Sequence, residues 1–143
     1  MIALDTNVLV YAHRRESQFH EQAKELVKTL AEGTPSWSIP WPCIYEFYSV
    51  VTNPRIWKTE ATPPKIAAQQ ITAWTDAPSL QLLTETQDFL ATVLPIMAQP
   101  RIRGPIVHDA RIAALCLAHG IDELVTKDRD FQLFPRLKTR DPF

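Results

Sequence analysis

A chain of 143 residues is the size of a single domain and long enough to bury a hydrophobic core, so we expect one domain over residues 1–143. With 45% hydrophobic and 22% charged residues, the composition excludes an intrinsically disordered chain. Fifteen basic and sixteen acidic side chains give a formal net charge of -1, which excludes a strongly basic coat for nucleic acid but leaves room for a local basic rim.

Short apolar segments alternate with amphipathic segments along the chain. In the first half we expect a strand at residues 2–4, a helix between Ser17 and Gly33, a strand at 36–39, and a helix from Pro42 to Asn53. In the second half we expect a helix at about 63–77, a strand at 80–83, a helix at about 87–97 that Pro95 kinks or ends, a loop at 99–106, a helix at about 107–118, and strands at 123–126 and 137–139.

The alternation of strands and helices predicts an α/β domain. Such a chain forms right-handed crossovers, which give a mainly parallel sheet, here of four or five strands, with helices on both faces. Ligands of these sheets gather outside the carboxyl ends of the strands. Asp5 follows the first predicted strand and Asp128 follows the fourth, so both are expected at the same edge of the sheet.

Five acidic residues occupy positions where a solvated surface charge is not the first expectation: Asp5, Glu46, Asp109, Asp128 and Asp130. Asp5 lies between apolar runs, and burying a bare carboxylate is so costly that it must be paired, hydrogen-bonded, metal-bound or protonated. Taken singly, such acids also have structural interpretations, because acids favour the first turn of a helix and the turn after a strand.

Carboxylates gathered at one sheet edge repel one another, and protonation or bound cations relieve that repulsion. Mg²⁺ and Mn²⁺ prefer carboxylate and water oxygens and need neither His nor Cys as ligands. Two such ions offset four carboxylates, generate hydroxide from bound water and stabilise both oxygens of an in-line phosphoryl displacement. If the acids converge in space, the set therefore suits hydrolysis of a phosphodiester bond.

Four segments carry a resemblance to a known family. They are "LDTNVLVYA" at the start, "IPWPCIYEFYSVVTNP" in the middle, and "VHDARIAALCLAHGI" and "LVTKDRDFQLF" near the end. In this order they resemble the four motifs of the PIN-domain nucleases, in particular the VapC-like toxins of type II toxin–antitoxin pairs. The resemblance covers nearly the whole chain and implies a PIN-like nuclease domain that hydrolyses RNA with Mg²⁺ or Mn²⁺.

The resemblance implies a role for each acid. Asp5 matches the central metal ligand at the end of the first strand, and Glu46 matches an acid that projects from its helix into the pocket. Asp109 completes the principal metal site. Asp128 matches the fourth acid, with Asp130 as the alternative in the same motif.

Other matched positions would support the site or bind substrate. Thr6 and Asn7 match residues that hydrogen-bond around the first acid, and Thr126 matches the threonine that ends the fourth strand; capping of the turn after a strand is their structural alternative. Arg14 and Arg129 stand at motif ends and are candidate contacts for the RNA backbone.

The family resemblance and the pattern of cysteines and apolar segments also predict the partners and the cellular compartment. The resemblance implies a homodimer and a cognate antitoxin whose C-terminal segment covers the pocket. Cys43 and Cys116 show no zinc-ligand spacing and are expected to be buried free thiols, which fits a reducing cytoplasm. The N-terminus lacks a basic leader, and no segment approaches the ~20 apolar residues that span a bilayer.

Two other function classes compete with the nuclease. An aspartyl-phosphate phosphatase also begins with an Asp after an apolar strand, but it usually carries a second Asp two positions later, where this chain has Asn7. A non-catalytic PIN-like module that binds RNA or a protein partner is the third hypothesis. The loss of an acid would favour it, whereas every expected acidic position is filled here.

Overall fold

Five strands and seven helices make up the domain. The computed structural model describes residues 1–143. The strands are β1 (Ile2–Leu4), β2 (Trp37–Pro40), β3 (Leu80–Leu83), β4 (Glu123–Val125) and β5 (Thr139–Arg140). The helices are α1 (Thr6–His13), α2 (His20–Glu32), α3 (Trp41–Val51), α4 (Pro54–Trp57), α5 (Pro64–Thr75), α6 (Phe89–Met97) and α7 (Ile106–Ala118), with 3-10 turns η1 (Lys58–Glu60) and η2 (Arg129–Leu133).

The sheet is wholly parallel, with strand order β3-β2-β1-β4-β5. From β1 the chain adds β2 and β3 on one side and then crosses over to add β4 and β5 on the other. The predicted α/β class and parallel sheet are therefore confirmed. The order reverses between β1 and β4, and this switch point is where open parallel sheets leave a crevice beyond the carboxyl ends of their strands.

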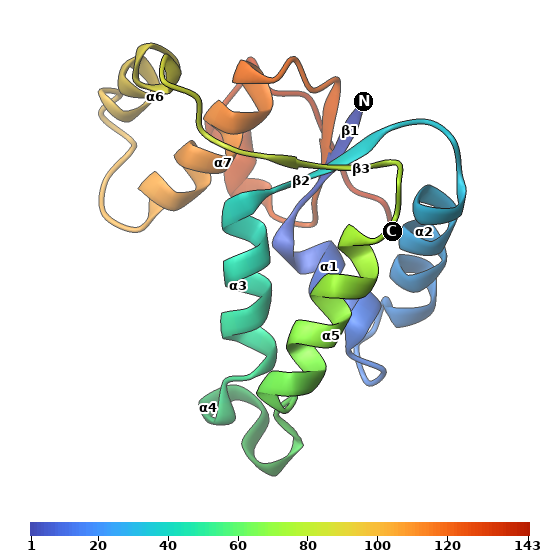
Figure 1. Ribbon diagram of the computed structural model, residues 1–143. Coiled ribbons are helices and arrows are strands. Elements are labelled where there is room, and N and C mark those ends of the chain that lie inside the picture. Colours follow the sequence, from blue (N-terminus) through green and yellow to red (C-terminus); the bar gives the residue numbers. More distant parts are fainter.

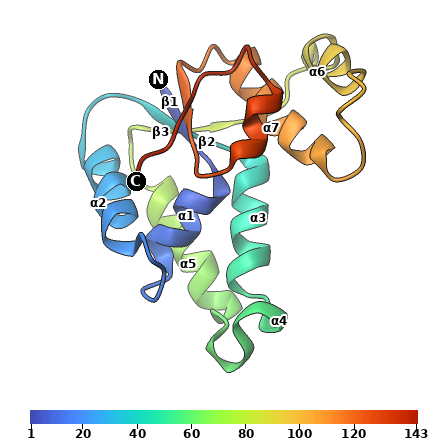
Figure 2. The same cartoon turned by 180° about the vertical axis from the view of Figure 1, so that it is seen from behind.

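Helices cover both faces of the sheet, as predicted. Figure 1 shows α1, α2, α3 and α5 on one side of the strands and α6 and α7 on the other, and the view from behind in Figure 2 agrees. A single cluster of 29 buried apolar residues fills the space between these layers. Within it the Phe47 ring of α3 lies edge-on to His13 and to Trp74, at centroid distances of 5.3 and 4.7 Å. This packing fixes α3, and with it the direction in which Glu46 projects.

The structure differs from the predicted elements mainly at short helices and strands. Helices α1 and α4 were not predicted, and the fifth strand lies at 139–140 instead of 137–139. Ser17 does not cap α2, which begins at His20; its hydroxyl donates instead to the carbonyl oxygens of Tyr11 and Arg14 at 3.1 and 2.8 Å. Pro95 lies inside the last turn of α6.

Two further expectations concern the thiols and the helices. Cys43 and Cys116 are buried and unpaired, as predicted. None of the helices combines the length and the apolar character needed to cross a membrane.

Candidate metal centre

Asp5 is the most deeply buried acid of the chain, with only 4% of its surface exposed. It follows β1 directly and is the N-cap of α1, where its Oδ1 accepts a hydrogen bond from the Thr6 backbone N–H at 2.8 Å. Asp is one of the residue types preferred at the N-cap of a helix. The sequence places Asp5 at the switch point because a strand of three residues ends there and a helix begins at once.

A hydrogen-bond network joins Asp5 to the end of β4. The Thr126 hydroxyl donates to Asp5 Oδ2 at 2.6 Å, and Asn7 Nδ2 donates to the same oxygen at 2.9 Å. Asn7 also accepts from the Lys127 backbone N–H at 3.1 Å. The two central strands are therefore tied together at their carboxyl ends, and donors from Thr6, Asn7 and Thr126 orient the Asp5 carboxylate.

Glu46 approaches the same place from α3. This helix begins immediately after β2, and Pro42 stands in its first turn, where its missing N–H costs nothing. The half-buried Glu46 side chain accepts a hydrogen bond from the Thr6 hydroxyl at 2.6 Å. Thr6 therefore connects the second acid to the segment that carries the first.

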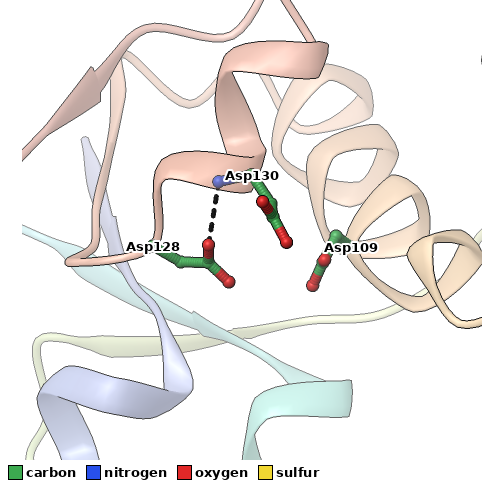
Figure 3. A group of neighbouring side chains, drawn as sticks. All are labelled: Asp109, Asp128 and Asp130. Carbon is green, nitrogen blue, oxygen red and sulfur yellow. Dashed lines mark hydrogen bonds between the residues drawn. The ribbon is translucent and has the colours of Figure 1, made fainter. Parts of the chain in front are cut away.

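Three further acids lie together at the other wall of the crevice. Figure 3 shows Asp109 of α7 facing Asp128 and Asp130, which flank the start of η2. One carboxylate oxygen from each of the three lies within 4.8 Å of the others. Asp128 also accepts a hydrogen bond from the Asp130 backbone N–H at 2.8 Å, so it caps η2 while one of its oxygens stays free.

Asp5, Glu46, Asp109 and Asp128 line one pocket of about 310 Å³. Its other lining residues are Thr6, Asn7, Val10, Tyr11 and Val50. Residues from four segments of the chain thus meet at the switch point of the sheet, and Asp130 lies beside Asp109 and Asp128 at its rim. We call this the carboxylate pocket.

Burial and the neighbouring carboxylates raise the pKa of two acids of the pocket, Asp5 and Asp109. Burial, followed by the charges of Glu46 and Asp128, raises the pKa of Asp5 from 3.8 to about 6, although the hydrogen bonds from Thr126 and Thr6 oppose the rise. Burial and the nearby charges of Asp128 and Asp5 raise the pKa of Asp109 to about 6 as well. Negative charge is therefore concentrated here beyond what the protein groups neutralise.

The donor set suits a hard divalent cation. Oxygens that face each other across one magnesium ion are about 4 Å apart, which is close to the spread of the Asp109, Asp128 and Asp130 oxygens. One sulfur contacts the pocket acids directly: Cys43 donates a hydrogen bond to Asp5 Oδ1 at 3.7 Å. Burial raises the pKa of the Cys43 thiol far above its usual range, so it stays protonated and is no thiolate ligand. The sequence predicted that Cys43 is buried but not that it contacts Asp5.

The two arginines expected to contact RNA have different surroundings. Arg14 is 7% exposed, and its guanidinium donates to Glu16, to the Glu60 carbonyl at 2.8 Å and to the Thr62 hydroxyl at 3.2 Å. It is therefore occupied inside the protein at the far end of α1. Arg129 is exposed and lies directly after Asp128.

Comparison with known proteins agrees with this geometry. The family model described as PIN domain matches residues 2–137. "Ribonuclease VapC48" from Mycobacterium tuberculosis is 33% identical over 139 residues, which is 97% of this chain and 95% of that protein. "Ribonuclease VapC43" from the same organism is 32% identical over 142 residues, 99% of this chain and 95% of that protein.

Solved structures show the same fold at lower identity. FitAcB from Neisseria gonorrhoeae matches with a TM-score of 0.68 at 18% identity, covering 99% of this chain and 98% of that one. VapBC2 from Rickettsia felis, bound to a DNA fragment from its promoter, matches with a TM-score of 0.66 at 19% identity and covers 98% of both chains. Since the family model and these relatives span nearly all its residues, the chain belongs to the PIN-domain family and is related to the VapC ribonucleases.

Proposed function

We propose that the protein is a divalent-metal-dependent endoribonuclease, the toxin of a toxin–antitoxin pair. The observation that carries the proposal is the carboxylate pocket, in which Asp5, Glu46, Asp109 and Asp128 meet at the switch point of the sheet. Its excess negative charge calls for cations, and oxygen-only ligands favour Mg²⁺ or Mn²⁺. The relationship to proteins named ribonucleases supports RNA as the substrate.

In this proposal each acid has a defined task. Asp5, Glu46, Asp109 and Asp128 would hold the metal, with Asp130 as a further ligand beside Asp109 and Asp128. When bound, the ion lowers the pKa of a coordinated water and stabilises the charge that develops on the phosphate. The protein keeps the ligands in place: Thr126, Asn7 and the Thr6 backbone fix the Asp5 carboxylate, and the Thr6 hydroxyl fixes Glu46.

The test uses a charge-removing substitution of the same shape. Purified wild-type protein is expected to cleave a structured RNA with Mg²⁺ or Mn²⁺ and to lose this activity in EDTA. Asp5→Asn is expected to abolish cleavage, whereas Asp76→Asn, the same change at an exposed position at the end of α5, is expected to leave it unchanged. Sequencing the RNA ends produced by the wild type and by Asp5→Asn identifies the cut site.

Two results would contradict the proposal in different ways. Equal cleavage by the wild type and Asp5→Asn would reject Asp5 as a ligand. Calorimetry that detects no divalent-ion binding, together with uncut RNA, would favour a non-catalytic module that holds RNA or a protein partner.

We further propose a homodimer and a cognate antitoxin whose C-terminal segment covers the carboxylate pocket. The matched structures named VapBC2 and FitAcB support a paired protein of this kind. Light scattering on the purified chain is expected to give twice its mass of 16.3 kDa. Co-expression with the product of the adjacent upstream reading frame is expected to give a complex that no longer cleaves RNA.

A further inference from the structure

A second hollow, of about 220 Å³, adjoins the carboxylate pocket and shares Asp128 with it. No apolar residue lines it. Its lining residues are Thr126, Lys127, Asp128, Arg129, Gln132, Thr139 and Asp141. We call it the polar hollow. Unlike the carboxylate pocket it contains cations, and these alternate along the chain with Asp128 and Asp130.

The two cations of the polar hollow are held differently. Lys127 Nζ bonds to Asp141 Oδ2 at 2.7 Å and lies 4.7 Å from the centroid of the Phe19 ring. Its backbone N–H is bound by Asn7, so the residue is fixed relative to Asp5. The guanidinium of Arg129 is exposed and has no ion pair or hydrogen bond in the structure. One cation is thus held by a carboxylate and the other is free.

An RNA strand laid across the carboxylate pocket needs such cations. Every nucleotide adds a phosphate, and the phosphates next to the scissile one lie close to the acids, which repel them. Lys and Arg contacts to the backbone supply most of the sequence-independent affinity for nucleic acid. The polar hollow places Lys127 and Arg129 directly beside Asp128, whereas Arg14 is enclosed by Glu16, Glu60 and Thr62.

We propose that the polar hollow binds the phosphodiester next to the scissile one, through Lys127 and Arg129, and that this phosphate displaces Asp141 from Lys127. The proposal rests on the nuclease function proposed above and names where the substrate backbone is held. Asp141 acts as a stand-in anion while no RNA is bound.

The ion pair between Lys127 and Asp141 is suited to exchange. The Asp141 side chain is 55% exposed and that of Lys127 is 24% exposed, and ion pairs in contact with water are weak and screened by salt. The hydrogen bond from Lys127 lowers the pKa of Asp141, so its carboxylate is charged at neutral pH and competes with a phosphate for the same ammonium. Removing that charge should therefore favour RNA.

The test measures binding without cleavage. Anisotropy of a labelled single-stranded RNA is titrated with the Asp5→Asn protein in Mg²⁺ at several salt concentrations. Lys127→Gln and Arg129→Gln, each added to Asp5→Asn, are expected to reduce the slope of log K against log salt by about 0.7, the value for one lost contact to a single strand. Asp141→Asn is expected to increase the affinity at low salt.

A matched control is available at Lys65, an exposed lysine in the first turn of α5. This helix begins near α4, at the end of the molecule that is remote from the strands (Figure 1). Lys65→Gln removes the same charge and is expected to leave the slope unchanged. If Lys127→Gln and Arg129→Gln change the slope no more than Lys65→Gln does, the polar hollow is not a phosphate site. If Asp141→Asn leaves the affinity unchanged, Asp141 does not compete with RNA.

Kinetics separate binding from chemistry in the otherwise wild-type protein. Lys127→Gln is expected to raise KM and leave kcat unchanged, because the contact is made equally in the ground and transition states. A lower kcat with an unchanged KM would overturn the assignment as a binding residue. Failure of the nuclease proposal is distinguishable, because the wild-type protein would then leave the RNA intact in Mg²⁺ while the binding slopes are still measured.

Discussion

One hydroxyl group, that of Thr126, holds three parts of the carboxylate pocket together. It donates to Asp5 Oδ2 at 2.6 Å and accepts from Asn7 Nδ2 at 3.1 Å and from the Asp128 backbone N–H at 2.9 Å. A hydroxyl has one proton and two acceptor lone pairs, so Thr126 is fully used. Because it is 4% exposed, water cannot replace these bonds easily.

Replacement of this hydroxyl by a methyl group is a sharp test of the network. Thr126→Val keeps the shape but removes one of the hydrogen bonds to Asp5 and leaves the Asp128 N–H without its partner, and it should reduce the free energy of unfolding by about 1–3 kcal/mol. It should also lower RNA cleavage, because the Asp5 carboxylate loses its orientation. Urea unfolding and initial cleavage rates measure the two effects.

Thr126→Ser serves as the control for this pair of measurements. It retains the hydroxyl and removes only the methyl group, so both stability and cleavage are expected to stay near wild type. Should the serine variant behave like the valine variant, the methyl packing of Thr126 would matter and the hydrogen bonds would not.

The residue types of the site could be recognised from the sequence, but their contacts could not. Asp5, Glu46, Asp109 and Asp128 were predicted from motifs, and their meeting in one pocket depends on strand order, which no local pattern encodes. The contact between Cys43 and Asp5 joins residues 38 positions apart. An apolar context predicts that a cysteine is buried, but it does not reveal which oxygen the thiol faces.

At the scale of elements, helix α1 decides which residues reach the site. Its eight residues carry the chain about 12 Å away from Asp5, so Arg14 lies at the opposite end. There the guanidinium lies 3.9 Å from the centroid of the Trp57 ring and bonds to the Glu60 carbonyl. Arg14 therefore anchors the end of α1 to the segment that connects α4 with α5.

Loss of this anchor is expected to lower the stability of the fold rather than to act directly on the chemistry of the carboxylate pocket. Arg14→Ala removes the contacts of a buried guanidinium to Glu60, Thr62 and Trp57, which is expected to cost about 1–3 kcal/mol in urea unfolding. Arg15→Ala, at the exposed neighbouring residue, is expected to stay within about 0.5 kcal/mol of the wild type. Equal losses in both variants would show that charge alone, not the buried contacts, accounts for the effect.

Helix α1 also shows why some elements escape prediction. Its sequence TNVLVYAH has no clear apolar stripe and contains β-branched valines, which are common in strands. The N-cap at Asp5 is its main helical signal, and that residue was interpreted as an acid at a strand end. Strand β5 has only two residues and forms because β4 offers a free edge. Longer elements such as α2, α3 and α7 carry enough periodic residues to be predicted.

At the scale of the whole molecule, the parallel sheet brings carboxylates together at one edge, and their charge lowers the stability of the folded protein. The pKa of Asp5 rises from 3.8 to about 6 because the residue is buried, and so the folded protein holds this proton more tightly than the unfolded chain does. Such a group contributes stability that is fully present below about pH 4 and is lost as the pH rises through about 6. In the metal-free protein this amounts to about 3 kcal/mol.

The last prediction compares unfolding of the wild type and Asp5→Asn in EDTA at pH 4 and pH 7. The asparagine does not titrate, so the difference reports the titration of Asp5 together with the effect of its charge on the pKa of Asp109. The wild type is expected to lose up to about 3 kcal/mol relative to the variant between these pH values. Adding Mg²⁺ at pH 7 should restore the free energy of unfolding that the wild type has lost, because an ion that binds only the folded state stabilises it. The same addition should stabilise Asp5→Asn much less. An unchanged difference between pH 4 and pH 7 would mean that the Asp5 carboxylate is already compensated without metal, by the donors from Thr6, Asn7, Thr126 and Cys43.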